Sequence, residues 1–128
     1  MKLSFIKPVH AHCDLPCGVY DPAQARIEAQ SVHEMMKKYD GLDEENKIRA
    51  IFIKDQRADM VKHHLWVLWS DYFKPEHLEK YPDLHDKFWK TTKQASACKK
   101  TNDASEGQKL LDMIDEIAEI FWATKKQA

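Results

Sequence analysis

Apolar residues recur every three or four positions in four segments of the chain, which is the spacing of one face of an α-helix. No segment alternates convincingly at the two-residue period of a β-strand, so the pattern predicts an all-α protein. Asp21 followed by Pro22 predicts the start of the first helix, and Gly41 predicts its end. Pro75 is expected to stop the second helix. The four expected helices span about 21–41, 44–73, 82–98 and 105–124.

The apolar faces of these segments predict one shared core. The core residues expected from the periodicity are Ala25, Ala29, Val32, Met36 and Tyr39; Ile48, Ile51, Ala58, Val61, Leu65, Leu68 and Tyr72; Leu84, Phe88, Thr91, Ala95 and Cys98; and Leu110, Ile114, Ile117 and Phe121. Helices joined by short connections favour an antiparallel four-helix bundle. Cys98 is expected to be a small buried hydrophobe and not a redox group. The tryptophans are interpreted as core or interface residues: Trp66, Trp69, Trp89 and Trp122.

Length and charge narrow the possible functions. A chain of 128 residues that is 43% hydrophobic can bury a sizeable core but is too short for two ordinary domains. Its 20 basic and 21 acidic residues leave a formal net charge of -1, which gives no reason to expect nucleic acid or an anionic membrane as a partner. No apolar run approaches the roughly 18 residues of a membrane-spanning helix. We therefore expect a soluble protein that acts on a small molecule.

The segment that suggests chemistry lies before the first helix and reads His12-Cys13-Asp14-Leu15-Pro16-Cys17-Gly18-Val19-Tyr20. If the chain is cut before His12, its free amine, the amide nitrogen of Cys13 and the Cys13 thiolate close two adjacent chelate rings around one metal. Cys17 adds a second thiolate, and the His12 imidazole remains as an axial ligand. Two nitrogens and two sulfurs in a plane suit Ni(II) or Cu(II). Pro16 and Gly18 favour a tight turn between the thiols.

The same two cysteines also allow other interpretations. Their spacing alone fits a local disulfide or two unrelated thiols. A thiol–disulfide protein is a second hypothesis, but the chain lacks the βαβ pattern and the two-residue thiol spacing of thioredoxin-like proteins. A third hypothesis is a non-catalytic helical bundle that stores or delivers nickel or copper. His63 and His64 are adjacent and would face different directions on a helix, so zinc binding by this pair is not expected.

The run 12–20 closely resembles the amino-terminal nickel hook of nickel superoxide dismutases, and the resemblance continues to residue 29. Further matching runs are 62–64, 67–75, 79–82 and 121–126, so the resemblance covers essentially everything from His12 onward. It implies an oxidoreductase that converts two superoxide anions and two protons to dioxygen and hydrogen peroxide by Ni(III)/Ni(II) cycling. It also implies a nickel ion bound by His12, Cys13 and Cys17.

The resemblance assigns further residues to the site. Tyr20 and Tyr72 resemble the family's tyrosines near the open face of the metal, and Asp14 resembles the carboxylate that orders the hook. Glu28 and Arg57 each fall on an otherwise apolar stripe, where periodicity alone equally allows ion-pair partners at the edge of the stripe. A buried charge is costly unless it is paired. The resemblance favours a glutamate and an arginine that hold the histidine ligand through hydrogen bonds.

Residues 1–11 are expected to be a leader that is removed on maturation. The apolar stretch before Lys7 is only residues 3–6, which is shorter than a secretory signal needs, so we do not expect export by that route. The resemblance implies instead a propeptide removed inside the cell by a peptidase, which frees the amine of His12. It further implies a cytoplasmic, antioxidant homohexamer. The mature domain would comprise the hook at 12–20 and the helical bundle at 21–128.

Overall fold

The computed structural model describes residues 17–126, and the regular structure within them is entirely helical. In chain order the elements are α1 (Ala23–Lys38), a 3-10 turn (Tyr39–Gly41), α2 (Glu44–Val67), a π-helical turn (Leu68–Tyr72), α3 (Pro75–Lys80), α4 (Leu84–Lys99) and α5 (Ala104–Lys125). The prediction of an all-α fold is confirmed. Within this part of the chain, no helix is both long and apolar enough to cross a membrane.

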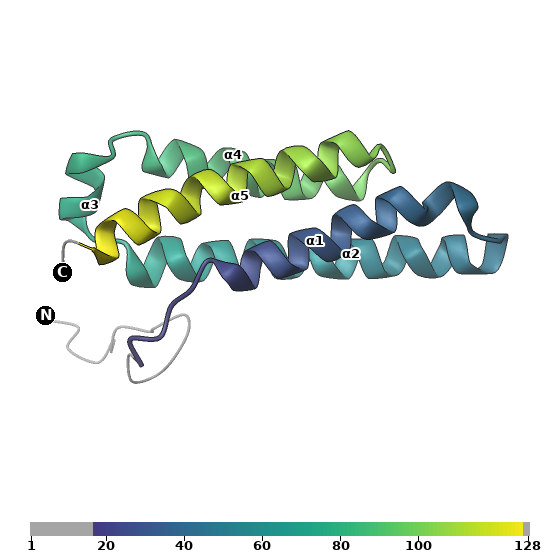
Figure 1. The fold of residues 1–128 in the computed structure, drawn as a ribbon, viewed down its shortest axis with the longest axis horizontal. Coiled ribbons are helices and arrows are strands. Elements are labelled where there is room, and N and C mark those ends of the chain that lie inside the picture. Colours follow the sequence, from purple (N-terminus) through teal and green to yellow (C-terminus); the bar gives the residue numbers. More distant parts are fainter. Residues whose placement is uncertain (1–16, 127–128) are drawn as a thin grey trace, which may run out of the picture.

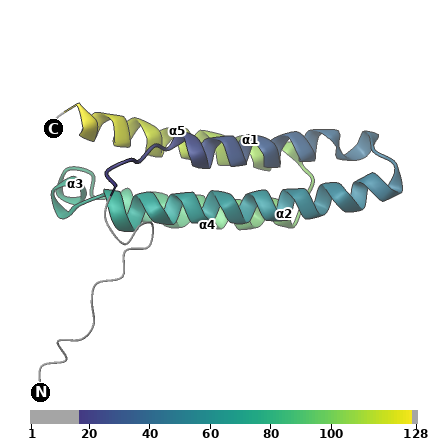
Figure 2. The same cartoon turned by 90° about the horizontal axis from the view of Figure 1, so that it is seen from below.

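The four long helices lie side by side along the longest axis of the molecule (Figures 1 and 2). α1 packs against α2 and α5, and α4 packs against the same two helices, so each long helix has two neighbours. Successive long helices run in opposite directions (Figure 1); the connections from α1 to α2 and from α4 to α5 are short, whereas α3 lies within the one from α2 to α4. The end of α2, α3 and the end of α5 consequently lie at one end of the molecule, and α1 starts in the half nearer to that end (Figure 1).

Polar side chains at the helix starts accept hydrogen bonds from the backbone N–H groups that the first helical turn leaves without partners. Asp43 and Asp103 each accept such a hydrogen bond at 2.9 Å, at the starts of α2 and α5. At the start of α1, the Asp21 carboxylate accepts from the Ala23 N–H at 2.8 Å. α1 begins at Ala23 with Pro22 in the cap position, so this helix starts slightly later than the sequence predicts.

The predicted core is confirmed for most positions. The buried residues that the periodicity predicted are Ala25, Ala29, Val32, Met36, Ala58, Val61, Leu65, Leu68, Leu84, Phe88, Thr91, Ala95, Cys98, Leu110, Ile114, Ile117 and Phe121. Tyr39 is half-buried, and Tyr72 packs against the core at its edge. The four long helices therefore share one apolar interior, as their amphipathic pattern requires.

The prediction was wrong for the first turns of α2. Ile48 is 59% exposed and Ile51 is 38% exposed, whereas Ala50 and Lys54 are buried. α1 and α2 extend beyond the loop that joins α4 to α5 (Figure 1), so the first turns of α2 have only α1 to pack against. Lys54 reaches that loop and donates to Asn102 Oδ1 at 2.8 Å. Burial lowers the pKa of the Lys54 ammonium group.

The connection between α2 and α4 contains structure that the periodicity did not predict. α2 and the π-helical turn that follows it end before Pro75, as expected. Pro75 is also the first residue of the short helix α3, a position at which proline is favoured. The Lys74 N–H donates to His77 Nδ1 at 3.0 Å and secures the start of α3. The ring of Phe73 meets that of Phe88 at 5.6 Å, which anchors the connection to the core. The chain thereby holds Tyr72, the residue before Phe73, beside the end of α5.

Candidate metal centre

The structure describes the last residues of the predicted hook, which make a tight turn. The Cys17 thiol is exposed, and the Val19 N–H is directed at Cys17 Sγ at 3.4 Å. Gly18 has a φ of 72°, in the left-handed region that favours glycine, as predicted for a residue that adopts backbone angles closed to others. The predicted turn between the two thiols lies outside the described residues. An amide N–H directed at sulfur suits a thiolate, the form of cysteine that binds metal ions. Three predicted site residues lie outside the described part of the chain: His12, Cys13 and Asp14.

Tyr20 and Tyr72, which the family resemblance assigns to one site, lie close together beside this turn. Their ring centroids are 5.7 Å apart, with an angle of 53° between the ring planes. The two rings line a cavity of about 380 Å³, and the other residues around it are Gly18, Asp71, Lys74, His77, Thr124 and Lys125. Two lysines against one aspartate make the lining cationic, which favours the approach of small anions.

Tyr72 is fixed by contacts that the sequence did not predict. Its phenol oxygen is 2.7 Å from Thr124 Oγ1, and its ring centroid is 4.4 Å from that of Phe121. His77 stacks on the ring at 5.8 Å, and Lys125 Nζ lies 5.2 Å from its centroid. One available signal was that Thr124 and Lys125 follow the core residue Phe121 by three and four positions and so share its side of α5.

Glu28 on α1 and Arg57 on α2 form an ion pair with each other. Arg57 Nη1 donates to the two carboxylate oxygens of Glu28 at 3.1 and 3.3 Å. The Glu28 side chain is only 15% exposed, whereas that of Arg57 is 42% exposed. Pairing with Arg57 offsets the free-energy cost of removing the Glu28 carboxylate from water. Because the Arg57 side chain is partly exposed to solvent, the pair contributes little free energy to stability. The two charges therefore pair with each other, as the periodicity alone allowed, whereas their predicted hydrogen bonds to His12 involve a residue outside the described part of the chain.

Comparison with known proteins identifies the family. Residues 7–125 match the model of the nickel-containing superoxide dismutases. The chain belongs to this family. The nickel superoxide dismutase of Streptomyces coelicolor is 59% identical over 119 residues, which cover 92% of this chain and 91% of that protein. The corresponding protein of Streptomyces seoulensis is 58% identical over the same shares of the two chains.

Solved structures of nickel superoxide dismutase have the same fold. The native structure superposes with a TM-score of 0.88 at 59% identity, covering 90% of this chain and 99% of that chain. A cyanide-treated apo structure superposes with a TM-score of 0.85 at 57% identity, covering 86% of this chain and 99% of that chain. At this level of identity and coverage, the family assignment extends over nearly the whole chain.

Within residues 17–126 of this member of the nickel superoxide dismutase family, no group of three or more His, Cys, Asp or Glu side chains is placed to bind a metal ion. The Cys98 thiol is buried, and burial raises its pKa to about 11, so it stays protonated and unreactive near neutral pH. Its predicted place as a small hydrophobe in the core is confirmed. The rings of His63 and His64 lie edge to face, with their centroids 5.4 Å apart.

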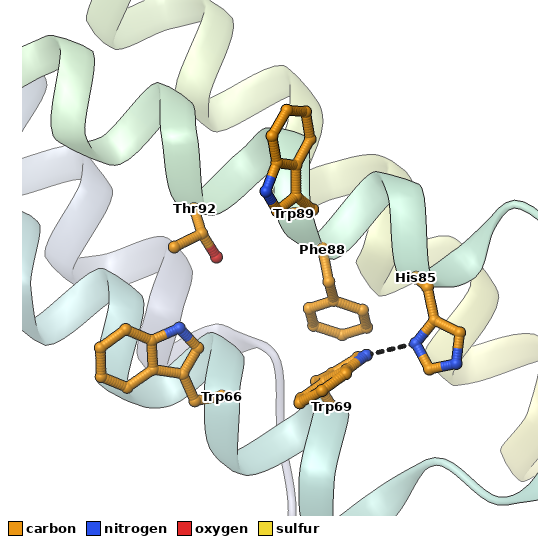
Figure 3. A pocket seen from close by; sticks show the side chains of 6 residues that line it. All are labelled: Trp66, Trp69, His85, Phe88, Trp89 and Thr92. Carbon is orange, nitrogen blue, oxygen red and sulfur yellow. Dashed lines mark hydrogen bonds between the residues drawn. The ribbon is translucent and has the colours of Figure 1, made fainter.

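The tryptophans lie at the surface, so their interpretation as core residues is wrong. Trp66, Trp69 and Trp89, each about half exposed, line an aromatic pocket of about 180 Å³ between α2 and α4 (Figure 3). The other lining residues of this aromatic pocket are His85, Phe88 and Thr92. The Trp69 indole N–H donates to His85 Nδ1 at 2.6 Å (Figure 3). A large ring whose N–H reaches a polar partner fits a half-exposed position better than a dry core.

Proposed function

We propose that this chain is a superoxide dismutase whose nickel ion is held by His12, Cys13 and Cys17. The observation that carries the proposal is the 59% identity to a nickel superoxide dismutase across 92% of the chain. The local structure supports it, because the turn at Cys17 lies beside the cationic cavity that Tyr20 and Tyr72 line.

The donor set fits nickel. The Cys17 thiol is accessible, and the turn at Gly18 directs an amide N–H toward the sulfur. We infer that Cys13 would supply the second thiolate and its amide nitrogen, and that His12 would supply its amine and its imidazole. Thiolates combined with nitrogen donors would suit nickel. When bound, nickel would supply the Ni(III)/Ni(II) redox couple for the exchange of electrons with superoxide.

The residues of the cavity select and order the reactants. The reaction consumes two superoxide anions and two protons and yields dioxygen and hydrogen peroxide. Lys74 and Lys125 attract the anion toward the cavity, while Tyr20, with Tyr72 behind it, orders small anions or water, and the two rings exclude larger molecules. That exclusion also protects the thiolates, which oxidants convert to sulfenic and sulfinic acids.

The charged residues near the hook hold its ligands in place. We infer that Asp14 orders the hook and that the Glu28–Arg57 pair holds the imidazole of His12 by hydrogen bonds. The support for the second role is that Glu28 is largely buried, already paired with Arg57, and positioned on the first turns of α1, close in sequence to the hook. Hydrogen bonds of this kind fix the orientation of a ligating imidazole and tune its basicity.

We also infer how the chain matures and assembles. A peptidase removes residues 1–11 in the cytoplasm and frees the amine of His12, because an amide nitrogen is a weaker ligand than an amine. The mature chain is an antiparallel four-helix bundle with an amino-terminal metal-binding hook. Six such chains form a homohexamer that needs no nucleic acid or membrane partner. The half-exposed tryptophans of the aromatic pocket support such assembly, since aromatic residues are enriched at protein interfaces.

The function is tested by measuring superoxide decay with purified protein that begins at His12 and is loaded with nickel. We expect rapid, nickel-dependent decay that the uncut chain and the nickel-free protein do not show. Nickel binding without superoxide decay would support a metal carrier instead. Activity that survives nickel removal would support thiol chemistry, and either result would contradict the proposal.

A further inference from the structure

We propose that Thr124 is a positioning residue whose hydroxyl oxygen accepts the phenol hydrogen of Tyr72. The Tyr72 oxygen then acts toward molecules in the cavity only as a hydrogen-bond acceptor. The inference rests on the proposed function in one respect, the placement of Tyr72 beside the metal. The hydrogen-bond assignment itself depends only on the contacts of three residues, Tyr72, Thr124 and Phe121.

The direction of the hydrogen bonds follows from counting protons. Thr124 Oγ1 lies 2.6 Å from the Phe121 carbonyl oxygen, one turn earlier in α5. A carbonyl oxygen can only accept, so the hydroxyl hydrogen of Thr124 is donated there. The Tyr72 oxygen is 2.7 Å from the same Thr124 Oγ1, and a threonine hydroxyl carries a single hydrogen. The phenol of Tyr72 must therefore be the donor to Thr124.

Burial makes this arrangement persistent. Thr124 is only 5% exposed, and its hydroxyl is bonded on one side to the helix backbone and on the other to the phenol. Leaving a buried polar group without a partner is costly, so both bonds are retained together. The ring of Tyr72 is held by Phe121 at 4.4 Å and by the stacked His77 at 5.8 Å, which prevents the phenol from turning to another partner.

The hydrogen bond to Thr124 determines how the Tyr72 oxygen can interact with a molecule in the cavity. With its proton committed to Thr124, the Tyr72 oxygen presents lone pairs to a molecule in the cavity. Lone pairs favour molecules that carry a hydrogen, such as water or hydrogen peroxide, over the superoxide anion, which carries none. Tyr72 therefore orders water or the protonated product, and the proton consumed in the reaction comes from another group.

The test uses Thr124→Val, which keeps the shape of the side chain and removes its hydroxyl, and Thr124→Ser, which keeps the hydroxyl. Thr91→Val is the matched control, because Thr91 is also buried in a helix and donates to a backbone carbonyl at 2.7 Å, but it lies outside the cavity. The first readout is the tyrosine doublet in the Raman spectrum of the nickel-free protein. Its intensity ratio reports whether a phenol donates or accepts, and subtracting the spectrum of Tyr72→Phe isolates Tyr72.

We expect a strong-donor signature for Tyr72 in the wild type, in Thr124→Ser and in Thr91→Val, and a shift to a solvent-like signature in Thr124→Val. A Tyr72 signature that does not change in Thr124→Val would overturn the hydrogen-bond assignment. This outcome is independent of nickel, so it leaves the proposed function untouched.

The second readout is superoxide decay with nickel-loaded chains that begin at His12. We expect Thr124→Val to lower the rate about fivefold, as for the loss of one hydrogen bond, and to have no further effect in a Tyr72→Phe background. Additive losses would contradict an action through Tyr72. Unchanged rates in every variant, with the Raman shift present, would refute the placement of Tyr72 beside the metal.

Discussion

Replacing Gly18 with alanine tests whether the turn at Cys17 prepares the hook for nickel. The φ of Gly18 is 72°, and a Cβ built at this position meets nothing within 4 Å. The substitution therefore causes no clash, and its whole effect is the cost of holding an alanine in the left-handed region. That cost is about 1–2 kcal/mol for an ordinary L-residue.

If nickel binding requires this backbone conformation, the penalty appears in the affinity for the metal. A penalty of about 1–2 kcal/mol corresponds to roughly 5–30-fold weaker nickel binding. The assay is competition for nickel between the chain beginning at His12 and a chelator of known affinity. Gly18→Asn is expected to recover part of the loss, because asparagine tolerates the left-handed region better than alanine does.

Gly41→Ala is the matched control, since a Cβ there also meets nothing within 4 Å and Gly41 does not have a positive φ. It lies at the far end of α1 and is expected to leave nickel affinity unchanged. The reasoning would be refuted if Gly18→Ala bound nickel as tightly as the wild type. It would also be refuted if Gly41→Ala weakened binding to the same extent.

Four further substitutions test the core, the buried thiol and the ion pair. Leu65→Ala, at a fully buried position, should lower the free energy of unfolding by about 2–5 kcal/mol, whereas Ile48→Ala should change it by less than about 0.5 kcal/mol in the same denaturant titration. Because burial raises the pKa of Cys98 from 9.0 to about 11, the folded protein keeps a proton that the unfolded chain releases, and stability should fall as pH rises through this window. In denaturant titrations across that pH window, the free energy of unfolding should fall less steeply with pH for Cys98→Ala than for the wild type. The same slope in both proteins would refute the raised pKa of Cys98. Glu28→Gln should alter unfolding by less than about 1 kcal/mol because its partner is partly open to solvent, yet it should reduce superoxide decay; unchanged decay would contradict its role at the ligand.

The helices could be predicted because their periodicity is strong and their ends carry local signals. Asp43 and Asp103 are caps that can be recognised in the sequence, and the stripe from Leu110 to Phe121 is continuous. The same periodicity failed at Ile48, because burial there depends on how far α4 and α5 extend along α2. That length is a property of the packed molecule and not of the segment itself.

The candidate site was predictable only in part. The run around Cys17 and Gly18 has a chemistry that its residue types and spacing imply, and the resemblance to a known family connected it to Tyr72. Thr124 could not be assigned to the site, because its contact with Tyr72 joins residues 52 positions apart. The contact forms only because the π-helical turn and α3 redirect the chain at the end of α2, and neither element has a periodic signal.

The ligation of nickel by Cys17 is tested most directly by X-ray absorption at the nickel edge, with the protein that begins at His12 beside its Cys17→Ser variant. We expect sulfur and nitrogen ligands in the wild type and the loss of one sulfur ligand in the variant. A nickel ion bound only by nitrogen and oxygen, or the same sulfur ligation in both proteins, would contradict the assignment of Cys17 to the metal.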